Sequence, residues 1–179
     1  MYNEIKIGNQ IWMSENLDVD HFRNSDPIPH VQDTAEWKKT GDEERPARCY
    51  YNNDPENGKK YGKLYNGYAA TDPRGLAPQG WHVPSKAEFE TLLGNWSQTG
   101  TARYDALISD GSSGFDALLG GYRYSNGSFS DYSDYAYFWS TTPYSSYYAW
   151  FLCLGSYSRN AYLYSNFYQY GFTFRCIKD

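Results

Sequence analysis

Alternation of apolar and polar residues predicts strands at both ends of the chain. Residues 5–13, IKIGNQIWM, alternate around a Gly-Asn pair and predict a hairpin or a bent strand. Near the other end, Phe172, Phe174 and Cys176 alternate with polar residues and predict a second strand. The two ends of the chain are therefore expected to consist of extended segments.

A further strand is predicted around residue 152. Trp150, Leu152 and Leu154 alternate with Phe151 and Cys153, which is typical of a half-buried strand. If Trp150 and Leu152 face the core, then Phe151 and Cys153 point outward to solvent.

Helical spacing is clearest in residues 80–96. Ser85 followed by Glu88 forms the pattern of a capping box, and Gly94 marks a natural end of the helix. Between them, apolar residues recur at helical spacing in Phe89, Leu92 and Leu93. We therefore expect one well-defined helix here.

Shorter helices are predicted at 33–39, where Asp33 provides a cap and Glu36 reaches back, and at 102–108. Residues 61–70 place Leu64, Tyr65, Tyr68 and Ala69 on one helical face. Residues 20–46 are polar and proline-containing, and we interpret them as a surface insertion. Ser-, Tyr- and Asn-rich stretches predict turns and loops at 125–135 and 143–148, whereas 155–171 fits a strand plus loop or one long loop.

The amino-acid composition indicates that the core is aromatic rather than aliphatic. The chain has 179 residues, of which 20 are Tyr, and Leu, Ile, Val and Phe together contribute only 29. A net charge of −5 and an aromatic content of 20% argue against disorder, so we expect a single globular domain over residues 1–179 with an aromatic core.

Charge and tyrosine are distributed in opposite directions. Residues 1–121 hold 30 of the 37 charged residues, whereas residues 122–170 hold 13 of the tyrosines, interleaved with ten serines. No linker separates the two parts. We interpret the chain as one domain with two kinds of surface, and residues 122–170 as its candidate ligand-binding region.

Several classes of protein are excluded or disfavoured by the same counts. No apolar run is long enough to cross a bilayer, and no signal peptide is expected within residues 1–17, which lack a basic segment followed by an apolar stretch. The 16 basic residues form no cluster, which argues against nucleic acid as a partner. Three widely spaced cysteines fit neither a zinc knuckle nor a disulfide-rich scaffold.

Five stretches of the sequence resemble the Fibrobacter succinogenes major paralogous domain, which is frequent in surface proteins of Bacteroidetes and Fibrobacter. The similar segments follow the family's order and cover residues 49–70, 77–93, 113–129, 137–150 and 171–179. The resemblance implies an α+β, C-type-lectin-like fold in the branch that also contains the formylglycine-generating enzyme. Small antiparallel sheets would be flanked by two main helices and much irregular loop structure, with the two termini meeting in one small sheet.

The resemblance also implies a location and a state of the cysteines. A surface-exposed protein, on a bacterial cell or a phage particle, is expected. Many relatives carry cysteines where this chain has Gly58 and Ala77, so Cys49 and Cys176 are expected to lack disulfide partners. Simple drift and assembly in a reducing compartment, for instance in a phage particle, both explain this loss.

Residues suited to catalysis are scarce. His21, His30 and His82 are scattered, and His82 is expected to be structural, packed beside Trp81. Cys153 and Cys176 lie 23 residues apart, unlike the closely spaced copper-binding pair of formylglycine-generating enzymes. With no nucleophile elbow either, we expect no catalytic residue and no enzymatic activity.

Metal and cofactor binding are also not expected. The calcium-binding strings of C-type lectins, Glu-Pro-Asn and Trp-Asn-Asp, do not occur. Asp131 and Asp134 are the alternative for a hard cation such as calcium, although the favoured interpretation is that both are ordinary turn residues.

The strongest positive feature is a surface rich in Tyr and Ser, the mixture that antibody loops use to bind ligands. We expect a non-enzymatic module that binds a protein or a glycan on a cell or phage surface. The alternatives are a structural surface domain, in which the tyrosines fill the core, and a cryptic relative of the formylglycine-generating enzyme. The residues expected to form the ligand-binding face are Tyr144, Tyr147, Tyr148, Phe151, Tyr157, Arg159, Asn160, Tyr162, Tyr164, Asn166 and Tyr168.

This face also resembles the variable region of proteins diversified by retroelements. Mutated adenines in AAC codons yield Tyr, Ser and Asn but never Lys, Glu or Met, and residues 144–170 contain none of the latter three. Trp150 and Gln169 would then be fixed positions. The family is rich in Tyr, Ser and Asn here in any case, so both origins remain open.

Overall fold

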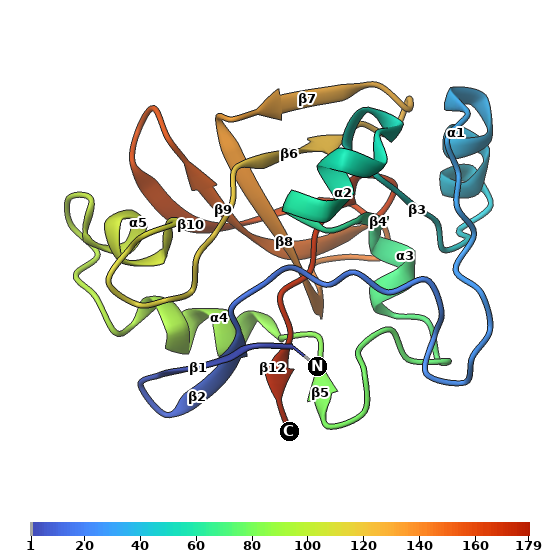
Figure 1. The fold of residues 1–179 in the computed structure, drawn as a ribbon. Coiled ribbons are helices and arrows are strands. Elements are labelled where there is room, and N and C mark those ends of the chain that lie inside the picture. Colours follow the sequence, from blue (N-terminus) through green and yellow to red (C-terminus); the bar gives the residue numbers. More distant parts are fainter. Residues whose placement is uncertain (1) are drawn as a thin grey trace.

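The computed structural model describes residues 2–179, in which short helices surround three antiparallel sheets, so the α+β class is confirmed (Figure 1). Within this range there are five α-helices rather than two main ones, and one 3₁₀ turn, η1 (Tyr51–Asn53). The helices are α1 (Thr34–Asp42), α2 (Pro55–Tyr61), α3 (Gly67–Ala70), α4 (Lys86–Leu93) and α5 (Ala102–Leu107).

The first sheet joins the two ends of the chain, as expected. It has the order β1-β2-β12-β5, with every neighbouring pair antiparallel. The predicted hairpin over 5–13 is confirmed, and its turn contains Gly8 at a φ of 58°. The strands are β1 (Glu4–Ile7), β2 (Gln10–Met13), β12 (Ile177–Lys178) and β5 (Trp81–His82).

The second sheet passes through the middle of the molecule. Its order is β10-β9-β8, built from β8 (Tyr135–Pro143), β9 (Tyr148–Gly155) and β10 (Asn160–Phe167). One face packs on an aromatic cluster that includes Trp139 and Phe172. The other packs on a cluster with Leu152 and Phe138, beneath α4 and α5.

Because core clusters cover both faces of this sheet, one prediction about β9 is wrong. The strand was expected to be half-buried, but Phe151 and Cys153 are only 6% and 2% exposed, on the face opposite Leu152 and Leu154. Both alternating sets are apolar because both faces of the strand lie against core, as in strands covered on two sides. Phe151 therefore supports the fold and does not belong to a ligand-binding face.

The third sheet has the order β3-β4-β11-β6-β7. It corrects the prediction of a helical face over 61–70, because Leu64–Asn66 forms a fully buried strand between β3 and β11, and only Gly67–Ala70 is helical. Burial and pairing on both sides thus override the local helical pattern. The strands are β3 (Arg48–Cys49), β4 (Leu64–Asn66), β11 (Gly171–Phe172), β6 (Gly120–Arg123) and β7 (Phe129–Tyr132).

The predicted helices at 33–39, 80–96 and 102–108 are confirmed as α1, α4 and α5. Asp33 caps α1 through the amide of Glu36, whereas the Glu36 side chain pairs with Arg45 and does not reach back. In α4 the capping box is complete: Ser85 accepts from the Glu88 amide, and the Glu88 carboxylate accepts from the Ser85 amide.

Two fully buried arginines tie distant segments together. Arg123 donates to the carbonyls of Val31, Gln32 and Gly127, and so fastens the segment before α1 to β6. Arg175 donates to four oxygens, two of them the backbone carbonyls of Phe115 and Asp116. Both guanidinium groups lie over aromatic rings as well.

The three cysteines are buried free thiols. Burial raises the pKa of Cys49 to about 11 and those of Cys153 and Cys176 to about 12. Among the described residues, none of the helices combines the length and apolar composition needed to cross a membrane.

Candidate functional site: an aromatic patch beside the central sheet

Six aromatic side chains form a chain of ring contacts at the surface. We call them the aromatic patch: Tyr124, Tyr144, Tyr148, Trp150, Phe167 and Tyr170. Adjacent ring centroids lie 5.1 Å apart for Tyr124–Tyr170, 6.5 Å for Tyr170–Phe167, 4.1 Å for Phe167–Tyr148, 6.4 Å for Tyr148–Tyr144 and 5.4 Å for Tyr144–Trp150. Tyr144 is 61% exposed, Phe167 40% and Tyr124 38%, while the other three are half-buried.

The patch rests on a rigid base. The loop between β8 and β9 is closed by hydrogen bonds from the amides of Tyr144 and Ser145 to the carbonyl of Tyr148, at 2.8 and 3.1 Å. The carbonyl of Tyr147 accepts from the amide of Tyr168, which fixes this loop to the turn after β10. The exposed rings therefore stand on a backbone that is already ordered, so little conformational entropy is lost when a ligand binds.

A second, buried layer of rings supports the patch from below. Tyr170 stacks on Tyr122 at 5.7 Å, and Tyr122 in turn contacts Phe172 at 5.8 Å. Phe172 lies 4.4 Å from the fully buried Trp139. Burial, together with the neighbouring Tyr124 and Tyr148, raises the pKa of Tyr170, so its hydroxyl is a neutral hydrogen-bonding group at neutral pH.

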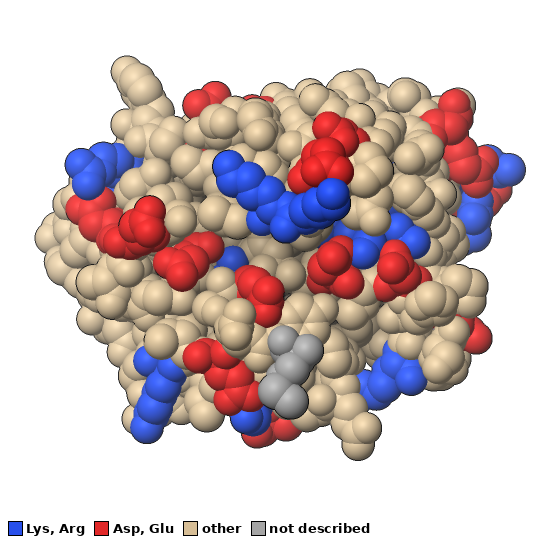
Figure 2. Space-filling model, viewed as in Figure 1, with Lys and Arg blue, Asp and Glu red and all other residues tan. Residues whose placement is uncertain are grey.

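The patch carries almost no charge. Within residues 2–179, its one close cation is Lys86, whose Nζ lies 4.6 Å from the ring centroid of Trp150. Elsewhere, on the face drawn in Figure 2, acidic and basic side chains lie next to one another without a broad basic area. A neutral aromatic surface suits an uncharged ligand that offers flat or apolar faces.

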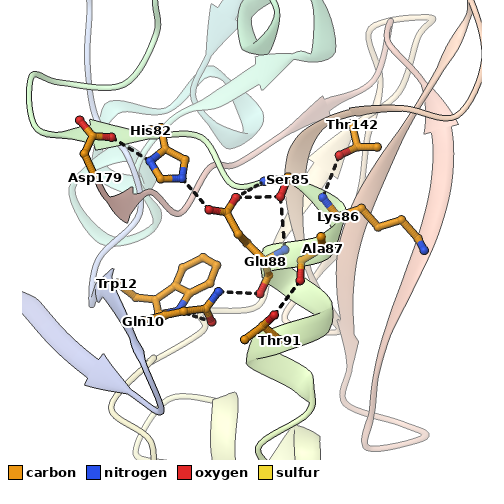
Figure 3. A network of polar contacts seen from close by, with 10 residues as sticks. All are labelled: Gln10, Trp12, His82, Ser85, Lys86, Ala87, Glu88, Thr91, Thr142 and Asp179. Carbon is orange, nitrogen blue, oxygen red and sulfur yellow. Dashed lines mark hydrogen bonds and ion pairs between the residues drawn. The ribbon is translucent and has the colours of Figure 1, made fainter.

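Lys86 begins α4, and a polar network around the first turn of this helix fixes its position (Figure 3). The Lys86 amide donates to Thr142 Oγ1 at 2.9 Å, and Thr142 lies at the end of β8. In the same turn, the Oε1 atom of Glu88 accepts from His82 Nε2 at 2.7 Å. The backbone carbonyl of Glu88 accepts from Gln10 Nε2 at 3.0 Å. The network thus connects β2, β5 and β8 to the residue beside Trp150.

His82 lies between two carboxylates in this network. Its Nδ1 lies 2.8 Å from Asp179 Oδ1, opposite the contact with Glu88. Partial burial alone would lower the pKa of His82, but the hydrogen bonds to Glu88 and Asp179 outweigh it and the pKa is raised. Burial would likewise raise the pKa of Glu88, but hydrogen bonds from Ser85 and His82 leave it lowered. The pair is therefore held as an ion pair, which fits the structural role expected for His82.

The same residues do not form a nucleophilic triad. Ser85 Oγ donates to Glu88 Oε2 at 2.8 Å and accepts from the Glu88 amide, so its partner is the carboxylate and not the imidazole. A serine nucleophile needs the histidine as its direct base. The arrangement instead completes the cap of α4.

The aromatic patch contains some of the residues predicted for the ligand-binding face. Tyr144 and Tyr148 belong to it, and Tyr147, 64% exposed, lies in the same loop. Phe151 and Tyr168 are corrections, because they are 6% and 7% exposed and face the buried aromatic cluster. Tyr168 directs its ring inward, where it stacks on Tyr68 at 5.4 Å.

The remaining predicted residues are distributed along the β9–β10 hairpin, from its tip to Asn166, which precedes Phe167 of the patch. Tyr157, 99% exposed, and Arg159 and Asn160 lie at its tip, which an eight-residue strand places about 27 Å from the loop that holds Tyr144. Tyr164 is 58% exposed and contacts the half-buried Tyr162 at 4.7 Å. Asn166 is half-buried and pairs with Ala149 on β9. The predicted residues are thus spread over two regions.

Four members of the patch lie within the predicted ligand-binding region, 122–170, but are not among the individual residues predicted for the face. The sequence places Trp150 in the core, and it does not single out Tyr124, Phe167 or Tyr170. Phe167 and Tyr170 could be found from the sequence pattern of residues 160–171. The alternation through 160–167 predicts a strand that ends at Phe167, and Gly171 predicts a turn that places Tyr170 beside it. Tyr124 joins them only through the pairing of β6 with β11, which local sequence does not reveal.

Asp131 and Asp134, the alternative cation ligands, form hydrogen bonds within the protein. Asp131 accepts from the hydroxyls of Ser130 and Tyr137, at 2.8 and 2.6 Å, and its carbonyl accepts from the Asp134 amide. Over residues 2–179, no group of three or more His, Cys, Asp or Glu side chains is arranged to hold a metal ion.

Comparison with known proteins agrees with the motifs. Comparisons with curated proteins and with solved structures yield no match. The model of the Fibrobacter succinogenes major domain matches residues 5–178, from β1 to β12. The chain therefore belongs to the Fibrobacter succinogenes major domain family.

Proposed function

We propose that this domain is a non-enzymatic binding module and that the aromatic patch contacts its ligand. The observation that carries the proposal is the unbroken chain of six surface rings on an ordered base. Tyr, Trp and Phe offer large contact areas with few rotatable bonds, so exposed clusters of them favour binding. The proposal requires no catalytic residue and no cofactor, and it assigns the domain to a cell or particle surface.

A glycan is the ligand that fits this patch best. Sugar rings present apolar C–H faces that stack on aromatic rings, and their hydroxyl groups can bond to the Tyr tips. The neutrality of the patch favours an uncharged chain of sugars over an acidic one, because Lys86 already lies against Trp150 and pairs with Glu90.

A glycan array with matched variants tests this proposal. Wild-type protein should bind a subset of neutral glycans, and Tyr144→Ala should reduce binding at least tenfold. The matched control is Tyr157→Ala, which removes an even more exposed tyrosine at the hairpin tip, outside the patch. Binding should persist in EDTA. Equal losses for the two variants, or no binding to any neutral glycan, would reject the proposal.

A protein ligand is the second candidate, and the hairpin tip favours it. Tyr157 is almost completely exposed and is flanked by Ser156, Ser158 and Arg159, a composition typical of antibody loops. If residues 144–170 vary through a retroelement, a reverse transcriptase gene and a near-identical template repeat should lie beside the gene. A neighbourhood without them would eliminate the hypervariable version.

A further inference from the structure

The central sheet ends in an edge strand with one unpaired side. β10 is the outer strand in the order β10-β9-β8, and all eight of its residues pair with β9 without a register shift. Within residues 2–179, the other backbone hydrogen bonds of β10 are both at Phe167: its amide donates to Asn166 Oδ1, and its carbonyl accepts from Tyr170. The remaining outward N–H and C=O groups of β10 have no partner in the described chain.

β10 lacks the features by which proteins usually protect such an edge. Exposed edge strands are commonly short, interrupted by a bulge, or equipped with Lys or Pro, because otherwise they pair with other chains. The sequence of β10, NAYLYSNF, has eight residues and contains no charge and no proline. A regular edge of this length is a template for an added strand.

A groove runs along the first half of this edge. Two neighbouring cavities, of about 420 and 280 Å³, share Gln98, Arg103 and Tyr162 in their walls. β10 forms one wall of the groove, and the end of α4, the start of α5 and their connection form the other. These helices and the hairpin lie at the same end of the molecule (Figure 1). A groove bounded by a strand edge and a polar loop suits an extended peptide.

The groove contains an uncompensated positive charge. Arg103 Nε donates to the carbonyl of Leu93 at 3.1 Å, and within residues 2–179 no carboxylate lies within ion-pair distance of its guanidinium. By contrast, Arg159 nearby pairs with Asp105. Glu90, an acidic residue in the wall of the groove, forms an ion pair with Lys86. Arg103 is therefore free to bind a carboxylate, for which its forked guanidinium is well suited.

We propose that an extended segment of a partner protein adds to β10 as a fourth strand and places an Asp or Glu side chain on Arg103. Main-chain hydrogen bonds to the free edge supply affinity, and the pairing with Arg103 supplies selectivity for acidic segments. A second copy of β10 fits less well, because NAYLYSNF offers no carboxylate to Arg103. This surface differs from the aromatic patch and does not depend on it.

Selection from a displayed library of random linear peptides on the purified domain provides the probe. The selected peptides should alternate β-branched or aromatic residues and contain an Asp or Glu. In fluorescence anisotropy, a labelled selected peptide should bind Arg103→Glu at least tenfold more weakly than wild type, and its Asp→Lys version should bind Arg103→Glu better than wild type. The matched control, Arg159→Glu, should change affinity less than twofold.

A second variant tests the edge itself. The amide of Phe167 points away from β9, and alternate residues share this direction, so Ser165→Pro removes an outward N–H without breaking the pairing with β9. Peptide binding should fall at least tenfold while the circular dichroism stays unchanged. Selection of no peptide, selected peptides that are indifferent to both variants, or a concentration-dependent dimer that Ser165→Pro abolishes, would each overturn the proposal.

Discussion

Arg175 shows how single residues hold this fold together. The side chain is fully buried, yet its hydrogen-bond partners are neutral oxygens: Asn16 Oδ1 and the carbonyls of Met13, Phe115 and Asp116. Burial lowers its pKa to about 9, so it remains charged at neutral pH. Buried charges are tolerated when their donors are satisfied, and here one guanidinium connects three segments of the chain.

Replacement of Arg175 by Lys should therefore destabilise the protein although the charge is kept. Lysine has three donors on a flexible stem and cannot reach four oxygens spread around a planar fork, so buried acceptors lose their partners. We expect the free energy of unfolding in urea to fall by about 2–4 kcal/mol. The exposed Arg159→Lys serves as control, with an expected loss below about 1 kcal/mol. Equal losses for the two variants would contradict this role.

His82 should make stability depend on pH in a defined window. Its pKa is raised in the folded state, so its contribution is complete below the unfolded value of 6.5 and is lost as the pH rises through the folded value. Glu88 behaves oppositely. Because its pKa is lowered in the folded state, its contribution to stability is complete above pH 4.5, the unfolded value, and is lost as the pH falls through the folded value. The contact between them contributes most between pH 4.5 and 6.5.

Urea unfolding of His82→Gln at pH 5.5 and pH 8.5 tests this window. The variant should lose more stability relative to wild type at pH 5.5 than at pH 8.5. Because the His82 side chain is 40% exposed, the difference should stay below about 1 kcal/mol. A larger loss at pH 8.5 would contradict the ion pair.

At the scale of elements, the close approach of neighbouring strands decides which positions in a sheet can carry a side chain. Gly121 in β6 has a φ of 66°, and a Cβ atom there would lie 2.4 Å from the carbonyl oxygen of Ser130 in β7. Gly80 has a similar φ of 82°, but a Cβ atom would meet nothing within 4 Å. A comparison of substitutions at Gly121 and Gly80 therefore distinguishes the cost of a left-handed backbone from the cost of a steric clash.

Gly121→Ala should be far more damaging than Gly80→Ala. Both variants carry the cost of a left-handed residue, about 1–2 kcal/mol, but only the first also forces β6 and β7 apart. We expect Gly121→Ala to lower the free energy of unfolding by at least about 3 kcal/mol. Thermal or urea unfolding measures both, and similar losses for the two variants would show that β7 moves freely.

Local chemistry made some elements predictable and left others hidden. The capping box of Ser85 and Glu88 and the Gly-Asn turn of 8–9 act within a few residues, so α4 and the β1–β2 hairpin followed from the sequence. Leu64–Asn66 became a strand because β3 and β11 bind it from both sides, and these partners lie far away along the chain. The same holds for Phe151, whose second buried face depends on Phe172.

At the scale of the whole molecule, the tyrosines serve two purposes. Some, such as Tyr65 and Tyr122, are buried in the core, whereas Tyr144, Tyr147 and Tyr157 are largely exposed. The sequence predicted a Tyr-rich face but could not show that the ends of β9 separate it into two regions. The aromatic patch arises where the β8–β9 loop and the turn after β10 meet, a contact that only the fold creates.

The most direct test of ligand binding at the aromatic patch is ¹⁹F NMR of protein labelled with 5-fluorotryptophan. Of six tryptophans, Trp150 alone belongs to the patch, and Trp150→Phe assigns its signal. On titration with the best-bound glycan of the array, the Trp150 signal should shift in a saturable manner, while that of the half-buried Trp96 stays unchanged. Saturable binding that leaves the Trp150 signal in place would contradict the assignment of the patch as the binding site.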